Sequence, residues 1–171
     1  MTTKRVSLAG LSLVVVAALV FAIIGFSSWW RADHDNSIGY AKTRDAVALA
    51  ARQDIVVLNT LNYQQLDTGL QNWLGASTGS LHDQLSQVSA SDKSAIVAAK
   101  TVTTGKVLDA AVTQLDDRAG TATVIATVEV TVTPAGGKAS VKKRNRYSAT
   151  LARVDSAWKL SDLAQVPVSV S

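Results

Sequence analysis

The sequence of 171 residues contains no cysteine, two prolines and two histidines. The lack of cysteine excludes disulfide frameworks, Cys-ligated zinc, iron–sulfur clusters and thiol catalysis. The two histidines, His34 and His82, are far apart in the chain and leave little material for a histidine-rich metal centre. We therefore expect neither a metal nor a cofactor.

The sequence also gives little sign of an enzyme. We find no glycine-rich loop of the P-loop or dinucleotide-binding type. Serine is abundant, so composition alone does not exclude a Ser-His-Asp triad, but nothing in the sequence places a serine beside either histidine, and we expect no hydrolase nucleophile elbow. The prediction is a protein without catalytic activity.

A long apolar run near the N-terminus predicts a membrane anchor. Residues 8–26 are nineteen residues without a charge, and extension to residue 30 gives a helix of roughly 34 Å, enough for a bilayer core. Trp29 and Trp30 stand where interfacial aromatic anchors belong. We predict a cytoplasmic N-terminus (1–7), a transmembrane helix (8–30) and an extracytoplasmic remainder, because Lys4 and Arg5 precede the run.

A cleaved signal peptide is the alternative for this run. Such peptides have an apolar region of about 7–15 residues, shorter than the one here, and end in a small-residue site. The candidate site, Gly25-Phe26-Ser27, is a poor one. The uncleaved single span is the better interpretation.

The net charge of +4 does not indicate a nucleic-acid-binding protein. Residues 31–171 carry 15 basic and 13 acidic side chains, which is close to neutral. Bulk attraction to polyanions should be weak, and a domain outside the cytoplasm would not meet nucleic acid.

Residues 31–40 read as a juxtamembrane hinge, and residues 41–171 as one extracytoplasmic α+β domain. A helical pattern covers residues 41–66, with an apolar stripe through Ala46, Ala50, Val57 and Leu61. Val47, Leu49 and Leu58 widen the stripe. We expect this long amphipathic helix to pack on a core.

The rest of the chain predicts short helices followed by a sheet. We predict that Gly69, Gly75 and Gly79 break residues 63–99 into short helices, the last one capped by Ser89 or Ser91. Residues 121–133 alternate strictly between Ala or Val and mostly Thr, the clearest strand signal in the chain. With a strand before it and two after it, joined by short turns, a four-stranded antiparallel meander results.

Several segments resemble the Mce-associated membrane proteins of mycobacteria and related actinobacteria. The matching residues are Tyr63, Leu66, Asp67, Thr78, Gly79, Gly105-Lys106-Val107, Arg146-Tyr147 and Trp158 to Leu163. The resemblance covers nearly the whole chain and implies a cone-shaped, nuclear-transport-factor-like fold with a curved sheet. It also implies an accessory subunit that stabilises or assists an Mce lipid-import complex, with Mce and permease subunits as partners.

Cone-shaped relatives include enzymes that use a carboxyl group in an apolar pocket, so four residues are candidates for chemistry. They are Asp54, Tyr63, Asp67 and Asp109. Alternation would put Asp109 on one sheet face with Val107 and Ala111. The plainer interpretations are a turn or cap acceptor for Asp67, a solvated or paired Asp109, and a core aromatic for Tyr63.

One basic cluster remains, at residues 138–146. On a strand, Lys142, Arg144 and Arg146 would point to one face, about 6.6–6.8 Å apart. Two interpretations stay open: a contact for anionic headgroups or an acidic partner, and a charged strand that discourages edge-to-edge pairing.

The leading hypothesis is a non-catalytic, membrane-anchored accessory subunit of an Mce lipid importer. The first alternative is an assembly scaffold of another envelope machine, such as type IV secretion, because a span followed by a cone-shaped domain would serve both. The second is a small-molecule binder or enzyme, which requires a cavity of a few hundred Å³ with a buried carboxylate.

Overall fold

The computed structural model describes residues 37–167 of the chain. The predicted cytoplasmic segment, the transmembrane helix 8–30 and its anchors Trp29 and Trp30 lie outside the described residues. No helix among residues 37–167 is long and apolar enough to cross a membrane. Of the predicted hinge 31–40, residues 37–40 are described, and they are helical. The chain divides into two units, Met1–Lys42 and Thr43–Ser171, and the second contains the fold.

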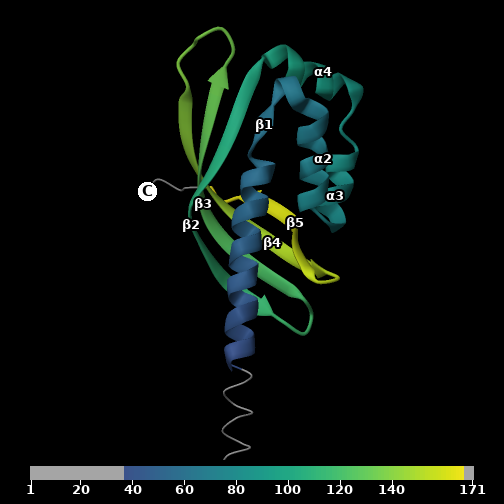
Figure 1. The fold of residues 1–171 in the computed structure, drawn as a ribbon, viewed down its shortest axis with the longest axis vertical. Coiled ribbons are helices and arrows are strands. Elements are labelled where there is room, and N and C mark those ends of the chain that lie inside the picture. The colour runs from purple at the N-terminus through teal and green to yellow at the C-terminus, as the bar shows by residue number, and fades with distance from the viewer. Residues whose placement is uncertain (1–36, 168–171) are drawn as a thin grey trace, which may run out of the picture. The chain divides into compact units, whose positions relative to one another are not determined.

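The second unit is α+β, with a five-stranded antiparallel sheet in the order β1-β2-β3-β4-β5 (Figure 1). The strands are β1 (Leu61–Asn62), β2 (Thr101–Asp116), β3 (Thr121–Pro134), β4 (Val141–Val154) and β5 (Ala157–Gln165). The predicted meander of four strands is confirmed as β2 to β5. The total of four is wrong, because the two-residue β1 pairs with residues 102–103 of β2.

Alternation in β3 determines which face of the sheet is covered. Ala122, Val124, Ala126 and Val128 are at most 3% exposed, whereas the threonines between them point to the other face. The buried row packs with Leu151 and Leu160 of β4 and β5 in one hydrophobic core. The outer face of the sheet therefore carries the second, mostly polar set of side chains.

Residues 43–58 form the helix that covers the inner face (Figure 1). Its fully buried side chains are Val47, Ala51 and Ile55, which repeat every four residues. The predicted stripe is confirmed in part: Val47 is fully buried, and Ala50 and Leu58 pack against the core. Ala46 and Leu49 of that stripe are exposed, Leu49 by 58%, so the buried face is narrower than predicted.

The described residues are helical from 37 to 58, so the predicted helix 41–66 began later than the helix does and ended eight residues too late. The Asn59 side chain donates from Nδ2 to the Ile55 carbonyl at 2.8 Å and accepts at Oδ1 from the Tyr147 hydroxyl at 3.2 Å. A Cβ on Gly105 of β2 would lie 2.6 Å from the Asn59 Cβ. The chain thus leaves the helix in close contact with β2 and pairs with it two residues later.

Four short helical segments follow β1. They are η1 (Tyr63–Gln65), α2 (Leu66–Ala76), α3 (Gly79–Ser86) and α4 (Ala90–Ala99). Gly69 and Gly75 lie inside α2, so the prediction that they break helices was wrong; Gly79, with φ of +56°, begins α3. Ser89 caps α4 in a capping box with Asp92, as predicted for one of the two serines.

Two β-bulges change the facing of β2. The register with β3 shifts between Val107 and Asp109 and again between Val112 and Gln114. Beyond the first bulge the residues that pack on the core are Ala110, Val112 and Leu115. Simple alternation therefore failed for Asp109, whose side chain is 86% exposed and does not share a face with Val107.

Candidate interaction surface

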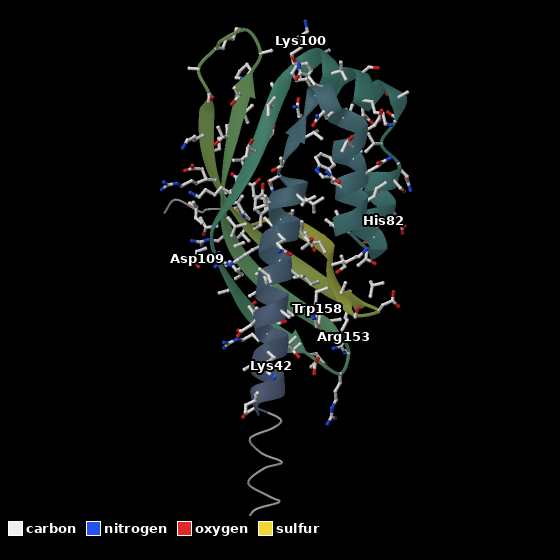
Figure 2. The ribbon with its side chains drawn as sticks, viewed as in Figure 1. Lys42, His82, Lys100, Asp109, Arg153 and Trp158 are labelled. Carbon is white, nitrogen blue, oxygen red and sulfur yellow. The ribbon has the colours of Figure 1, made fainter. Side chains whose placement is uncertain are left out.

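Half of the cations of the described residues lie at one end of the sheet, where β2 begins and the loop connects β3 to β4. We call residues 100–108 and 127–146 the basic arm. These residues contain a single carboxylate, Glu129, and seven cations: Lys100, Lys106, Lys138, Lys142, Lys143, Arg144 and Arg146. Figure 2 shows Lys100 at this end of the fold and Asp109 farther along β2. The other described residues hold seven cations and ten carboxylates, so the near-neutral total conceals a strong separation of charge.

Strand register and side-chain contacts place three of these cations around Glu129 on the outer face. Lys106 of β2 and Arg144 of β4 lie directly opposite Glu129 from either side. Lys142 Nζ lies 3.1 Å and Arg144 Nε 3.5 Å from the Glu129 carboxylate, which is 15% exposed. The hydrogen bond from Lys142, and to a lesser extent the one from Arg144, lowers the pKa of the Glu129 carboxyl group. The prediction that Lys142 and Arg144 share a face is confirmed, and Arg146 follows at the next alternate position.

The basic arm also has an edge that no described strand covers. β5 pairs with β4 from Tyr147 onward, and the last bond of this kind runs from the Val166 N–H to the Arg146 carbonyl at 2.8 Å. Residues 141–145 of β4 pair with β3 on one side, and within residues 37–167 nothing pairs with them on the other. An open strand edge and a row of cations therefore coincide.

Asp54 is the one candidate carboxylate with an altered environment. Its Oδ2 is buried and has no hydrogen-bond partner among the described residues. Burial raises the pKa of Asp54 from 3.8 to about 6, against the opposing attraction of Lys159. The residue lies on helix 43–58 one position before the fully buried Ile55.

The other candidate carboxylates are solvated and paired. Asp67 lies in the first turn of α2, is 83% exposed and bonds Lys93 of α4 at 3.1 Å. Asp109 accepts from Arg52 at 3.4 Å across the edge of β2. Tyr63 begins η1 and is half-buried. No hydrogen bond or ion pair among the described residues joins Tyr63, Asp67 or Asp109 to Asp54.

Two open cavities border these candidates. One of about 590 Å³ is lined by Tyr63, Asp67 and Lys93 among others, and its carboxylate is the exposed, paired one. The other, about 510 Å³, lies between helix 43–58 and β2 and is lined by Arg52, Gln53, Val56, Val57, Gly105, Lys106 and Val107. Asp54 lines neither cavity. The binder or enzyme alternative thus lacks its convergent buried carboxylate at both places.

A serine and a histidine do approach each other, contrary to prediction. Ser77 Oγ lies 3.5 Å from His82 Nδ1, and both atoms contact the Leu74 carbonyl, at 3.3 and 3.0 Å. A signal existed, since residues 75–79 have the G-x-S-x-G spacing. Because a carbonyl only accepts, Nδ1 carries the proton and cannot take one from Ser77, which is 2% exposed. A hydrolase nucleophile elbow connects a strand to a helix. Ser77 and His82 instead lie at the end of α2 and in α3, where they bind the last turn of α2.

Metal ligands were a further question for the site. Among residues 37–167 no group of three His, Cys, Asp or Glu side chains could hold a metal ion. The basic arm is an arrangement of the described residues that can recognise an opposite charge.

Solved structures with this fold include domains of bacterial envelope proteins. The periplasmic domain of DotI aligns with a TM-score of 0.59 and 19% identity, covering 72% of this chain and 95% of that one. CagV, described as a VirB8 homologue of the type IV secretion system of Helicobacter pylori, aligns with a TM-score of 0.56 and 8% identity, over 73% and 99% of the two chains. At these identities the alignments show a shared VirB8-like fold and nothing more.

Sequence comparison gives a mycobacterial relative. "Uncharacterized protein Rv1363c" of Mycobacterium tuberculosis is 27% identical over 168 residues, which is 95% of this chain and 63% of that protein. This chain thus spans under two thirds of its relative. A family profile described as "Uncharacterized protein Rv1363c/MT1408-like" matches residues 8–167, and the chain therefore belongs to the Rv1363c/MT1408-like family.

Proposed function

We propose that this chain is a non-catalytic, membrane-anchored accessory subunit that stabilises or assists an Mce-type lipid-import complex, with its α+β domain outside the cytoplasm. The observation that carries the proposal is the basic arm, which has seven cations, one carboxylate and an edge of β4 that no described strand covers. A surface of this kind suits docking to other subunits. The resemblance of the sequence to Mce-associated proteins names the complex, and the mycobacterial relative fits that source.

An assembly scaffold of another envelope machine is the second candidate. It is favoured by the fold, because the similar structures include an IcmL-like type IV secretion protein of Legionella pneumophila with a TM-score of 0.60 and 11% identity. Those proteins supply the precedent of a periplasmic domain with this shape. The two candidates predict different partners for the same surface.

A pull-down from native membranes in mild detergent, with partners identified by mass spectrometry, tests the proposal. The bait is the full chain, compared with K142E/R144E/R146E on the basic arm. The matched control, R44E/K93E/R118E, makes the same change in net charge at positions outside the arm. We expect Mce and permease subunits with the full chain and the control, and a loss of most of them with the arm variant.

Recovery of secretion components in place of Mce proteins would select the second candidate. Recovery of the chain alone would overturn both. Equal recovery with the arm variant and the control would show that the basic arm is not the docking surface.

A further inference from the structure

The uncovered edge of β4 presents a defined set of backbone groups. The Arg146 carbonyl accepts from Val166 of β5, so Arg146 directs its backbone groups toward the β5 side. Backbone direction alternates along a strand, and the N–H and C=O groups of Lys142 and Arg144 therefore point to the same side, where no described strand lies. The groups of Lys143 and Asn145 point to β3.

The side chains of the same residues form a row of positive charge. Lys142, Arg144 and Arg146 project from one face at every second position, so the row has the spacing of a strand. No carboxylate among the described residues lies within ion-pair distance of Arg146. Cations of this kind block an edge against a second copy or a neutral strand, because like or unpaired charges would face each other.

The fold itself shows how an acidic strand is received. On its covered side β4 pairs with β3, and Glu129 of β3 contacts both Lys142 and Arg144 across that pairing. A strand added on the uncovered side would bring its own alternate side chains to the same row. Acidic groups at those positions would pair with the cations, so the edge would accept an acidic strand and disfavour a neutral or basic one.

We propose that residues 141–145 of β4 accept, by strand addition, an extended partner segment with acidic side chains at alternate positions. The proposal deepens the proposed function and rests on it for the natural source of that segment, a partner subunit. A membrane surface is the less suitable occupant: the basic arm contains no Trp, Tyr or Phe to settle at headgroup depth, and Glu129 lies in the middle of its cations.

The test uses the full chain in mild detergent and two labelled peptides of one composition. The first, Thr-Glu-Val-Glu-Val-Glu-Thr, has its acids at alternate positions; the second, Val-Thr-Glu-Glu-Glu-Thr-Val, has them contiguous. We expect the alternating peptide to bind several-fold more tightly by fluorescence anisotropy. K142E/R144E/R146E should weaken it by about tenfold or more, whereas K143E, on the other face of the strand, should change it much less.

Amide hydrogen exchange gives a readout that charge attraction alone would not move. Binding of the alternating peptide should slow exchange at the Lys142 and Arg144 amides and leave Lys143 and Asn145, already paired with β3, unchanged. Equal affinity for the two peptides without this protection would overturn strand addition. So would binding to vesicles of anionic phospholipid without binding to either peptide. The pull-down is independent: success there with failure here would reject this inference alone.

Discussion

At the scale of single residues, Asp54 is the clearest case of a side chain held at a cost. Its buried oxygen lacks a partner among the described residues, and burial raises its pKa to about 6. Between pH 3.8 and about 6 the folded protein binds this proton more tightly than the unfolded chain does. Stability from this group therefore falls as pH rises through that window and stays reduced above it.

Replacement of Asp54 by Asn should remove this pH dependence. At pH 7 we expect D54N to be more stable than the wild type by about 1–2 kcal/mol, allowing for the solvent that still reaches the side chain. Near pH 4 the difference should shrink, since Asp54 is then protonated. Urea denaturation of both proteins at pH 4 and 7 measures this. D45N, at a carboxyl that is 73% exposed, is the control, and a D54N gain of equal size at both pH values would contradict the assignment.

Ser77 and His82 show the limit of a short motif. The G-x-S-x-G spacing at residues 75–79 contains Ser77, which does lie beside a histidine. Whether that histidine could take a proton from the serine depends on which ring nitrogen carries a hydrogen. The Leu74 carbonyl decides this, and no sequence pattern locates that carbonyl. The sequence predicts that Lys142, Arg144 and Arg146 share a face, because side chains alternate along a strand. The position of Glu129 beside them depends on strand register, which alternation alone does not give.

At the scale of elements, the sequence predicts the long strands and misses the places where two elements touch. The alternation of β3 fixed the strand and its buried face. The two-residue β1 was missed because two residues carry no period, and the bulges of β2 were missed because their cause is local geometry. The end of helix 43–58 depends on Asn59 and its contact with β2.

That contact gives a sharp test. G105A would place a Cβ 2.6 Å from the Asn59 Cβ, and Asn59 is held by bonds to Ile55 and Tyr147. We expect a loss of about 1–3 kcal/mol in unfolding free energy by urea titration. G75A is the matched control: nothing lies within 4 Å of that Cβ inside α2, and the change should be neutral or stabilising. Equal stability of the two variants would show that Asn59 gives way.

At the scale of the whole molecule, charge separation matters more than net charge. The basic arm has seven cations against one carboxylate, while the remaining described residues are net acidic. A negatively charged surface should attract the molecule through the basic arm, so the orientation of the molecule matters more for this attraction than its net charge.

Cation-exchange chromatography of the full chain in detergent measures this directly. K142E/R144E/R146E should elute at clearly lower salt than R44E/K93E/R118E, although the two variants carry the same net charge. Elution at the same salt would mean that the arm does not dominate the field. Circular dichroism of both variants checks that neither result reflects unfolding.

The order of the elements along the chain also determines when the hydrophobic core can form during synthesis. Helix 43–58 leaves the ribosome before every strand of the sheet, but its buried row, Val47, Ala51 and Ile55, packs with Leu160 in the last strand. About 100 residues separate the two, which at ordinary elongation rates is roughly 5–20 s during which the apolar row has no completed sheet to cover it. The nascent chain therefore passes through a long interval in which the apolar row of that helix stays exposed unless another protein covers it.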